Sequence, residues 1–209
     1  MSISDDRIAK AGAYVLYQGR YAFMVGFGGD TGTSVLNVVR FGGHREPGES
    51  PAQCALRELK EESSLDLLLC DAPCTYLARS GESALEKTGF SGRPRPILAR
   101  EGADRSVSVM YLAYGSGVLM PAMETQGVLL LAREDLRALC SGTLTLGSCL
   151  ERGAIALLAK PLPNSAPLRA AFQAQFLNDL FEREPECMER FESNAPAGDS
   201  PASIPGKRK

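Results

Sequence analysis

Two stretches near the start of the chain are rich in the aromatic and β-branched residues typical of strands. They cover residues 13–17 and 21–27, and Gln-Gly-Arg separates them, which predicts a β-hairpin. The glycine-rich segment 28–32 has neither the lysine nor the following helix of a phosphate-binding loop, so we interpret it as a long hairpin turn. Three further strands are predicted at 35–41, 74–79 and 106–114.

Helical patterns occupy other parts of the chain. Ser50 is suited to cap a helix and Pro51 to begin it, so we expect a helix from Pro51 to about Ser63. Two shorter helices and a longer amphipathic one are predicted at 133–140, 151–158 and 167–191. Strands and helices in this order predict an α/β sandwich rather than a regular βαβ winding.

The pattern divides the chain into three parts. Residues 1–165 are expected to form the main domain, and 166–192 a C-terminal helix packed on it or at a dimer interface. Residues 193–209 are rich in Pro, Ser, Ala and Gly, which predicts a disordered tail. Within the main domain, the polar stretch 80–104 is longer than an ordinary connection, so it is expected to be functional or mobile.

Composition and charge narrow the possible partners. The apolar fraction is 44% and the charged fraction 23%, an ordinary globular mixture. A net charge of −2 gives no general attraction to nucleic acid or to an anionic membrane, so neither is expected as a partner. Apolar runs are too short to cross a bilayer, and the acidic first residues do not resemble a secretory signal. We therefore expect a cytoplasmic protein.

The six cysteines do not indicate a metal site. No two of them form a CxxC pair, and His44 is the only histidine, so the spacing of a zinc site is absent. We expect free, mostly buried thiols, as in other proteins of a reducing compartment.

Candidate chemistry is concentrated on the helix that begins at Pro51. At about 100° per residue, Glu58, Glu61 and Glu62 form a stripe beside the apolar one that would face the sheet. Carboxylates at this spacing repel each other by about 0.2–0.5 kcal/mol per pair, and a divalent cation turns that repulsion into binding. The alternative is an ordinary solvated helix face, with Arg57 and Glu61 as a local ion pair.

The surrounding residues favour the metal site. Gly43, five residues, Glu49, seven residues, Arg57-Glu58-Leu59, one residue and Glu61-Glu62 reproduce the Nudix box. A chance match at the six glycine, arginine and glutamate positions has a probability on the order of 10⁻⁷ per start point. The chain therefore resembles a Nudix hydrolase. Ser64 departs from the pattern, which has glycine there to supply a left-handed backbone.

The resemblance implies a fold and a set of roles. The fold would be a Nudix-like α/β/α sandwich with a mixed β-sheet, extended by the C-terminal helix. Glu58, Glu61 and Glu62 would face Mg²⁺ or Mn²⁺, and Arg57, Glu61 and Glu62 would belong to the catalytic set. Arg57 would pair with Glu49 and hold the loop against the helix, and Gly43 would expose its backbone to the site. Glu124, on a later loop, is a candidate general base.

The implied activity is attack of water on phosphorus in a nucleoside diphosphate linked to another group, such as ADP-ribose, a nucleotide sugar or a nucleoside triphosphate. The alternatives are a non-hydrolytic module that binds a nucleotide-like ligand, and diphosphate isomerisation. Arg79, Arg93 and Arg95 could grip phosphates, although exposed loop residues are the simpler interpretation. His44 is expected to be exposed or structural, and a homodimer is possible.

Overall fold

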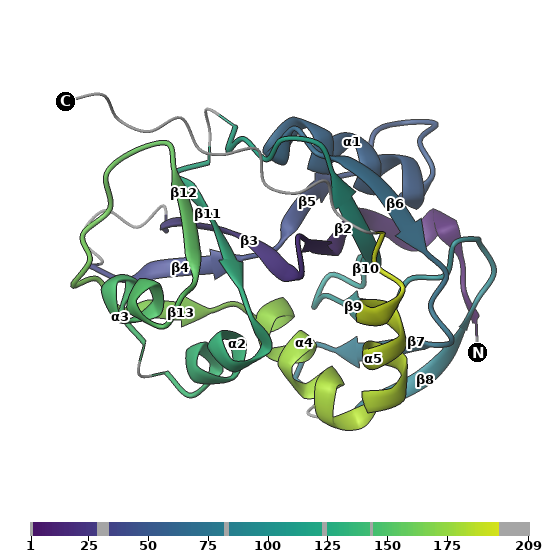
Figure 1. Ribbon diagram of the computed structural model, residues 1–209. Helices are drawn as coiled ribbons and strands as arrows, with labels where there is room; N and C mark the ends of the chain where they lie inside the picture. The colour runs from purple at the N-terminus through teal and green to yellow at the C-terminus, as the bar shows by residue number, and fades with distance from the viewer. Residues whose placement is uncertain (1, 29–33, 82–83, 123–124, 143, 197–209) are drawn as a thin grey trace.

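One mixed β-sheet with helices on both sides forms the framework of the protein (Figure 1). The computed structural model describes residues 2–28, 34–81, 84–122, 125–142 and 144–196. The strands in this part of the chain are β1 (Ser2–Ile3), β2 (Ile8–Tyr17), β3 (Arg20–Phe27), β4 (Leu36–Val39), β5 (Phe41–His44), β6 (Asp66–Cys70), β7 (Thr75–Arg79), β8 (Leu85–Phe90), β9 (Leu98–Glu101), β10 (Val107–Ser116), β11 (Gly127–Leu131), β12 (Ile155–Leu158) and β13 (Leu168–Ala170). The helices are the 3₁₀ turn η1 (Asp5–Arg7), α1 (Pro51–Ser63), α2 (Arg133–Cys140), α3 (Leu146–Glu151), α4 (Phe172–Arg183) and α5 (Pro185–Ser193).

The long strands β2 and β10 lie side by side and in parallel at the centre of the sheet. From β1 the main path runs β1-β8-β7-β9-β10-β2-β3-β11-β12, while β4 pairs with β3, β5 with β2, β6 with β10 and β13 with β4. Most neighbours are antiparallel, but β10–β2, β7–β9, β1–β8 and β13–β4 are parallel. The sheet is therefore mixed, and together with its flanking helices it confirms the expected α/β/α sandwich.

Alternation along the strands gives the sheet two buried faces. In β2, Ala13 and Val15 belong to one core cluster and Tyr14 and Leu16 to the other. The first cluster packs under α1 through Cys54, Ala55 and Leu59. The second packs against α2, α3, α4 and α5, and includes Leu136, Leu146, Phe176, Leu177 and Met188. Because successive side chains of a strand point to opposite faces, a strand covered on both sides must be apolar throughout.

The helix that carries the glutamates begins and ends where the sequence predicted. Ser50 Oγ accepts the Gln53 N–H and the Gln53 side chain accepts the Ser50 N–H, which forms a capping box ahead of Pro51. Ser64 ends the helix in the left-handed region, at φ 62°, and its N–H donates to the Lys60 carbonyl. Serine therefore adopts the left-handed backbone for which the box pattern uses glycine.

Several predictions about the second half of the chain were wrong. Residues 151–158 were expected to be a helix, but α3 ends at Glu151 and β12 follows, paired antiparallel with β11. The single helix expected over 167–191 is instead β13, α4 and α5. Pro185 explains the second break, because it has no N–H and disfavours helical backbone at Glu184, where φ is −133°.

Other differences are smaller. The strand expected at 35–41 is divided at Arg40 into β4 and β5, so that β5 pairs with β2 rather than β3. The polar stretch 80–104 contains β8 and β9, so it is part of the sheet rather than one long loop. β6 and β11 were not predicted as strands. Across the described ranges, no helix is both long and apolar enough to cross a membrane.

All six cysteines are free, as expected. Cys54 and Cys149 are fully buried, whereas the other four are partly exposed. The expectation of mostly buried thiols is therefore met only in part.

Candidate active site

The three glutamates of the predicted site line one cavity. Glu58, Glu61 and Glu62 project from the C-terminal half of α1 into a cavity of about 650 Å³. Its opposite walls come from β3, β4 and the segment before β11, through Met24, Val25, Gly26, Phe27, Gly28, Asn37, Val39, Ala122, Thr125 and Gln126. The sequence predicted the carboxylates but not these walls, because the walls come from segments distant in the chain.

Glu62 is the carboxylate most closely tied to the backbone of the box. Its Oε2 accepts the Gly42 N–H at 2.6 Å. Burial raises the pKa of Glu62 above its ordinary value, and the nearby charges of Glu58 and Glu61 raise it further, against the opposing effects of the Gly42 N–H and Arg40. A cation bound among these three carboxylates would offset the repulsion between their negative charges, as in other acidic metal sites.

Glu58 occupies space that a side chain at position 43 would fill. A Cβ built on Gly43 would lie 2.3 Å from Glu58 Oε2 and 2.5 Å from Glu58 Oε1, far inside contact distance. The absence of a side chain at Gly43 therefore lets the carboxylate rest directly on the β5 backbone. Gly42 is constrained differently, because its φ of +120° disfavours any other residue.

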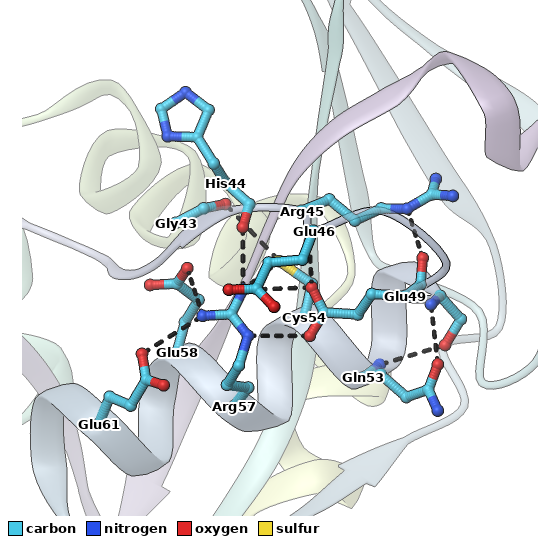
Figure 2. A network of polar contacts seen from close by, with 11 residues as sticks. Gly43, His44, Arg45, Glu46, Glu49, Gln53, Cys54, Arg57, Glu58 and Glu61 are labelled. Atoms are coloured by element: carbon cyan, nitrogen blue, oxygen red, sulfur yellow. Dashed lines mark hydrogen bonds and ion pairs between the residues drawn. The ribbon is translucent and has the colours of Figure 1, made fainter.

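Arg57 connects the loop before α1 to the carboxylates (Figure 2). Its Nε and Nη2 lie 2.9 and 3.1 Å from the two oxygens of Glu49, and Nη2 also donates to the His44 carbonyl at 2.9 Å. Its Nη1 lies 2.9 Å from Glu58 Oε1 and 3.3 Å from Glu61 Oε2. Both predicted pairings of Arg57 therefore occur together, and the one with Glu49 is bidentate.

The loop between β5 and α1 is held at several points. Hydrogen bonds from Arg57 and from the Glu46 N–H keep the pKa of Glu49 below its ordinary value. Arg45 donates to the Glu49 carbonyl through Nε and to the Asp5 carbonyl through Nη1, both at 2.5 Å. The loop is thereby attached both to α1 and to the start of the chain.

Arg40 is a neighbour of the site that the sequence analysis did not single out. It lies between β4 and β5, and its Nη1 donates to the Phe41 carbonyl at 2.9 Å. Burial lowers its pKa, whereas the charge of Glu62 has the strongest opposing effect. The guanidinium lies where a Cβ on Gly12 or Gly42 would be, at 2.7 and 2.3 Å from Nη1. The only sequence signal was a cation three residues before Gly43.

The donor set suits a hard divalent cation, although the carboxylates are not gathered around one point. Among the described residues, no three His, Cys, Asp or Glu side chains already form a compact metal cluster. Arg57 contacts one oxygen each of Glu58 and Glu61. In the contacts of the described residues, the second oxygen of Glu58, Glu61 and Glu62 accepts no hydrogen bond. Oxygen donors beside an open cavity match the preference of Mg²⁺ or Mn²⁺.

The other residues that the sequence singled out do not line the described part of the glutamate cavity. Glu124 lies outside the described residues. His44 is exposed, as expected, and contributes its backbone carbonyl to Arg57. Arg79 pairs with Glu86, Arg93 with Asp71, and Arg95 donates to the Pro73 carbonyl. Arg79 lines a cavity near β1, and Arg93 and Arg95 line one near α5, so the described walls of the glutamate cavity include none of these arginines.

Several solved structures are distantly similar to this chain. A crystal structure of a NUDIX-family hydrolase from Clostridium perfringens matches 61% of this chain and 82% of its own, at 20% identity and a TM-score of 0.43. A NUDIX hydrolase from Nitrosomonas europaea matches 60% of this chain and 57% of its own, at 14% identity and a TM-score of 0.40. An Ap4A hydrolase from C. elegans, in a binary complex, matches 60% of this chain and 80% of its own, at 16% identity and a TM-score of 0.38.

A comparison with curated proteins found no match. These structural likenesses are too distant to indicate a substrate, so the assignment rests on a different finding. The NUDIX domain family model matches residues 11–128, more than half of the chain, and this range contains the whole box. The chain therefore belongs to the NUDIX domain family, which confirms the expected family and, with it, the enzyme class of Nudix-type pyrophosphohydrolases.

Proposed function

We propose that this protein hydrolyses a phosphoanhydride bond in a nucleoside diphosphate linked to another group, and that it requires Mg²⁺ or Mn²⁺. The observation that carries the proposal is the shared cavity, which brings Glu58, Glu61 and Glu62 together beside space for a small ligand. The volume of about 650 Å³ lies within the range of small-molecule sites. A small nucleotide-like diphosphate, bound through the metal ion, is a ligand that suits a cavity of this size lined by three glutamates.

Glu58 and Glu62 are the principal proposed metal ligands, with Glu61 as the third. Glu58 is supported by its place against Gly43, and Glu62 by its bond to the Gly42 N–H. When bound, the metal would neutralise phosphate charge, orient the diphosphate and acidify a water molecule. Glu61 has the most exposed side chain of the three, at 61%, so it can follow the ligand as it enters.

The roles of the other box residues follow from their contacts. Arg57 is a positioning residue that sets the direction of Glu58 while it keeps Glu49 and the loop in place. Gly43 admits the Glu58 carboxylate to the β5 backbone. Two carboxylates are candidates for accepting the proton of the attacking water: Glu61 on α1, and Glu124, which the sequence suggested. Glu61→Gln and Glu124→Gln, compared at saturating substrate, would show which one lowers kcat.

The test is a phosphate-release screen over ADP-ribose, nucleotide sugars, nucleoside triphosphates and dinucleoside polyphosphates, with Mg²⁺ and with excess chelator. We expect turnover of at least one of these compounds only with metal, and we expect Glu62→Gln to lower it about 100-fold or more, since the charge of a metal ligand is lost. Glu151→Gln, at the exposed end of α3, is the matched control and should leave turnover unchanged.

Thermal unfolding of both variants would establish that they fold. Turnover in excess chelator, or full activity of Glu62→Gln, would contradict the proposal. Ligand binding without turnover of any compound in the panel would favour the alternative, a non-hydrolytic nucleotide-binding module.

A further inference from the structure

The end of the cavity away from the box is built from three neighbouring strands. β4, β3 and β11 lie side by side (Figure 1). Asn37 on β4 pairs with Gly26 on β3. Gln126 directly precedes β11, whose Gly127 pairs with Val25. Asn37 and Gln126 therefore flank Gly26, and all three residues line the cavity. Val39, two residues closer to the box along β4, lines the part between this end and the glutamates.

The orientation of the Asn37 amide is determined by Arg169. Nε of Arg169, on β13, donates to Asn37 Oδ1 at 2.9 Å. Since a guanidinium has no acceptor, the oxygen of this amide must face Arg169 and the NH₂ group must face the other way. Asn37 Nδ2 lies against Gly28, where a Cβ would be only 2.7 Å from it. Gly28 also lines the cavity, so the NH₂ group of Asn37 is directed along the cavity wall.

The orientation of the Gln126 amide is determined by the backbone of Phe27. The Phe27 N–H donates to Gln126 Oε1 at 3.1 Å, and a backbone N–H can only donate. The side chain of Gln126 lies across Gly26, where a Cβ would be 3.0 Å from Gln126 Cδ. The oxygen of this amide is therefore also occupied by the protein, and its NH₂ group donates to no other described residue, so we take it to face a ligand.

Phe27 adds an apolar surface to the same end. It lines the cavity and is 36% exposed, unusually high for a large aromatic residue. Thr125 also lines the cavity, and its hydroxyl donates to Met24 Sδ. The lone pairs of this hydroxyl remain as acceptors, but they lie beside Met24 rather than between the two amides. The side chains of Asn37 and Gln126 thus present donors at this end of the cavity.

We propose that Asn37 and Gln126 select a nucleobase whose edge carries two acceptors. Guanine and hypoxanthine present O6 and N7 side by side at one edge, whereas adenine presents an amino group beside N7 at the same edge. An amino group opposite an NH₂ donor leaves both without an acceptor, which costs binding free energy. This inference rests on the proposed function, because it places the base of a nucleotide at the end opposite the metal-binding glutamates.

Inosine and adenosine compounds provide the direct test, since their purines differ at the edge in question. We would measure kcat/KM for ITP and ATP, and for the two nucleoside diphosphate riboses, with Mg²⁺. We expect the inosine compound to be favoured about 10-fold or more, the discrimination that a bidentate base contact provides. Binding of IMP and AMP without metal, measured by calorimetry, should show the same preference independently of turnover.

Isosteric variants should reverse the preference. Asn37→Asp and Gln126→Glu keep the oxygens that Arg169 and the Phe27 N–H contact, but replace each NH₂ donor with an acceptor. The readout is the ratio between the two bases, because an added negative charge can lower the activity toward both. Gln175→Glu, an exposed amide on α4, is the matched control and should leave the ratio unchanged.

Arg169 is a positioning residue in this arrangement. Arg169→Ala should reduce the ratio toward one by letting the Asn37 amide turn over, and Arg169→Lys should restore part of it by supplying a donor. Metal-dependent hydrolysis with equal kcat/KM for inosine and adenosine compounds would overturn the inference and leave the proposed function intact. Absence of all hydrolysis would overturn the proposed function, and equal binding of IMP and AMP would then overturn the inference as well.

Discussion

At both ends of the cavity, donor groups orient the side chains that line it, but the side chains are charged at one end and neutral at the other. At the box end, Arg57 holds charged groups, and all of them lie between Gly43 and Glu62. At the far end, Arg169 and the Phe27 N–H hold neutral amides from strands that are distant in the chain. In both, a group that can only donate sets the direction of a side chain that faces the ligand.

The difference indicates a division of labour between the two ends. In the proposed function, carboxylates around a metal would act on the diphosphate, which every nucleotide substrate shares, so changes there should alter the rate for all substrates alike. Oriented amides act on the group that distinguishes one substrate from another, so changes there should alter ratios between substrates. Rate and selectivity should therefore be separable by mutation.

The largest effect that would test this separation is expected at Arg57. Arg57→Ala removes the donor from Glu49, Glu58 and the His44 carbonyl together, and hydrogen bonds to charged groups contribute about 1.5–3 kcal/mol each. We expect kcat to fall about 10- to 100-fold for inosine and adenosine substrates alike. Arg57→Lys should recover little of the loss, because an ammonium group cannot bridge both oxygens of Glu49. A changed base ratio in Arg57→Ala would show that the two ends are coupled.

A smaller effect is expected in the pH dependence of stability at Glu49. Its pKa is lower in the folded protein than its ordinary value of 4.5, so the folded state holds the ionised form more tightly. The stabilisation is complete above about pH 4.5 and is lost as the pH falls through the lower folded-state pKa. The difference in melting temperature between wild type and Glu49→Gln should therefore be constant near neutral pH and shrink in acid. A difference that grows in acid would contradict this linkage.

The smallest effect is expected at Ser64. Its φ of 62° is unfavourable for serine, and glycine adopts this conformation without steric cost. Ser64→Gly should stabilise the fold by about 1 kcal/mol or less, measured by urea unfolding, and should change neither kcat nor the base ratio. A loss of activity would show that Ser64 takes part in the site beyond its backbone.

Residues close together in the chain were sufficient to predict the structure of the box. Ser50 and Pro51 predicted the start of α1, the spacing of the glutamates predicted a shared stripe, and the structure directs Glu58, Glu61 and Glu62 into one cavity. These features depend on contacts between residues close in the chain, for which helix geometry and capping chemistry are adequate guides. Arg57 was predicted to choose between Glu49 and Glu61, and the structure shows that one guanidinium reaches both.

Local sequence failed where a distant partner decided the outcome. Residues 155–158 form a strand because β11 offers an edge for pairing, and 168–170 do so because β4 offers another. A short apolar run can be either helix or strand, and only the neighbouring strand settles the choice.

The sequence by itself therefore determined the family and the helix that carries the glutamates, because each depends on residues within about one helix length of one another. The tertiary structure alone decided the sheet order, the place of Arg40 beside Glu62, and the meeting of Asn37, Gln126 and Phe27 at one end of the cavity. Those arrangements depend on which strands become neighbours, and strand pairing is a property of the whole chain rather than of any segment.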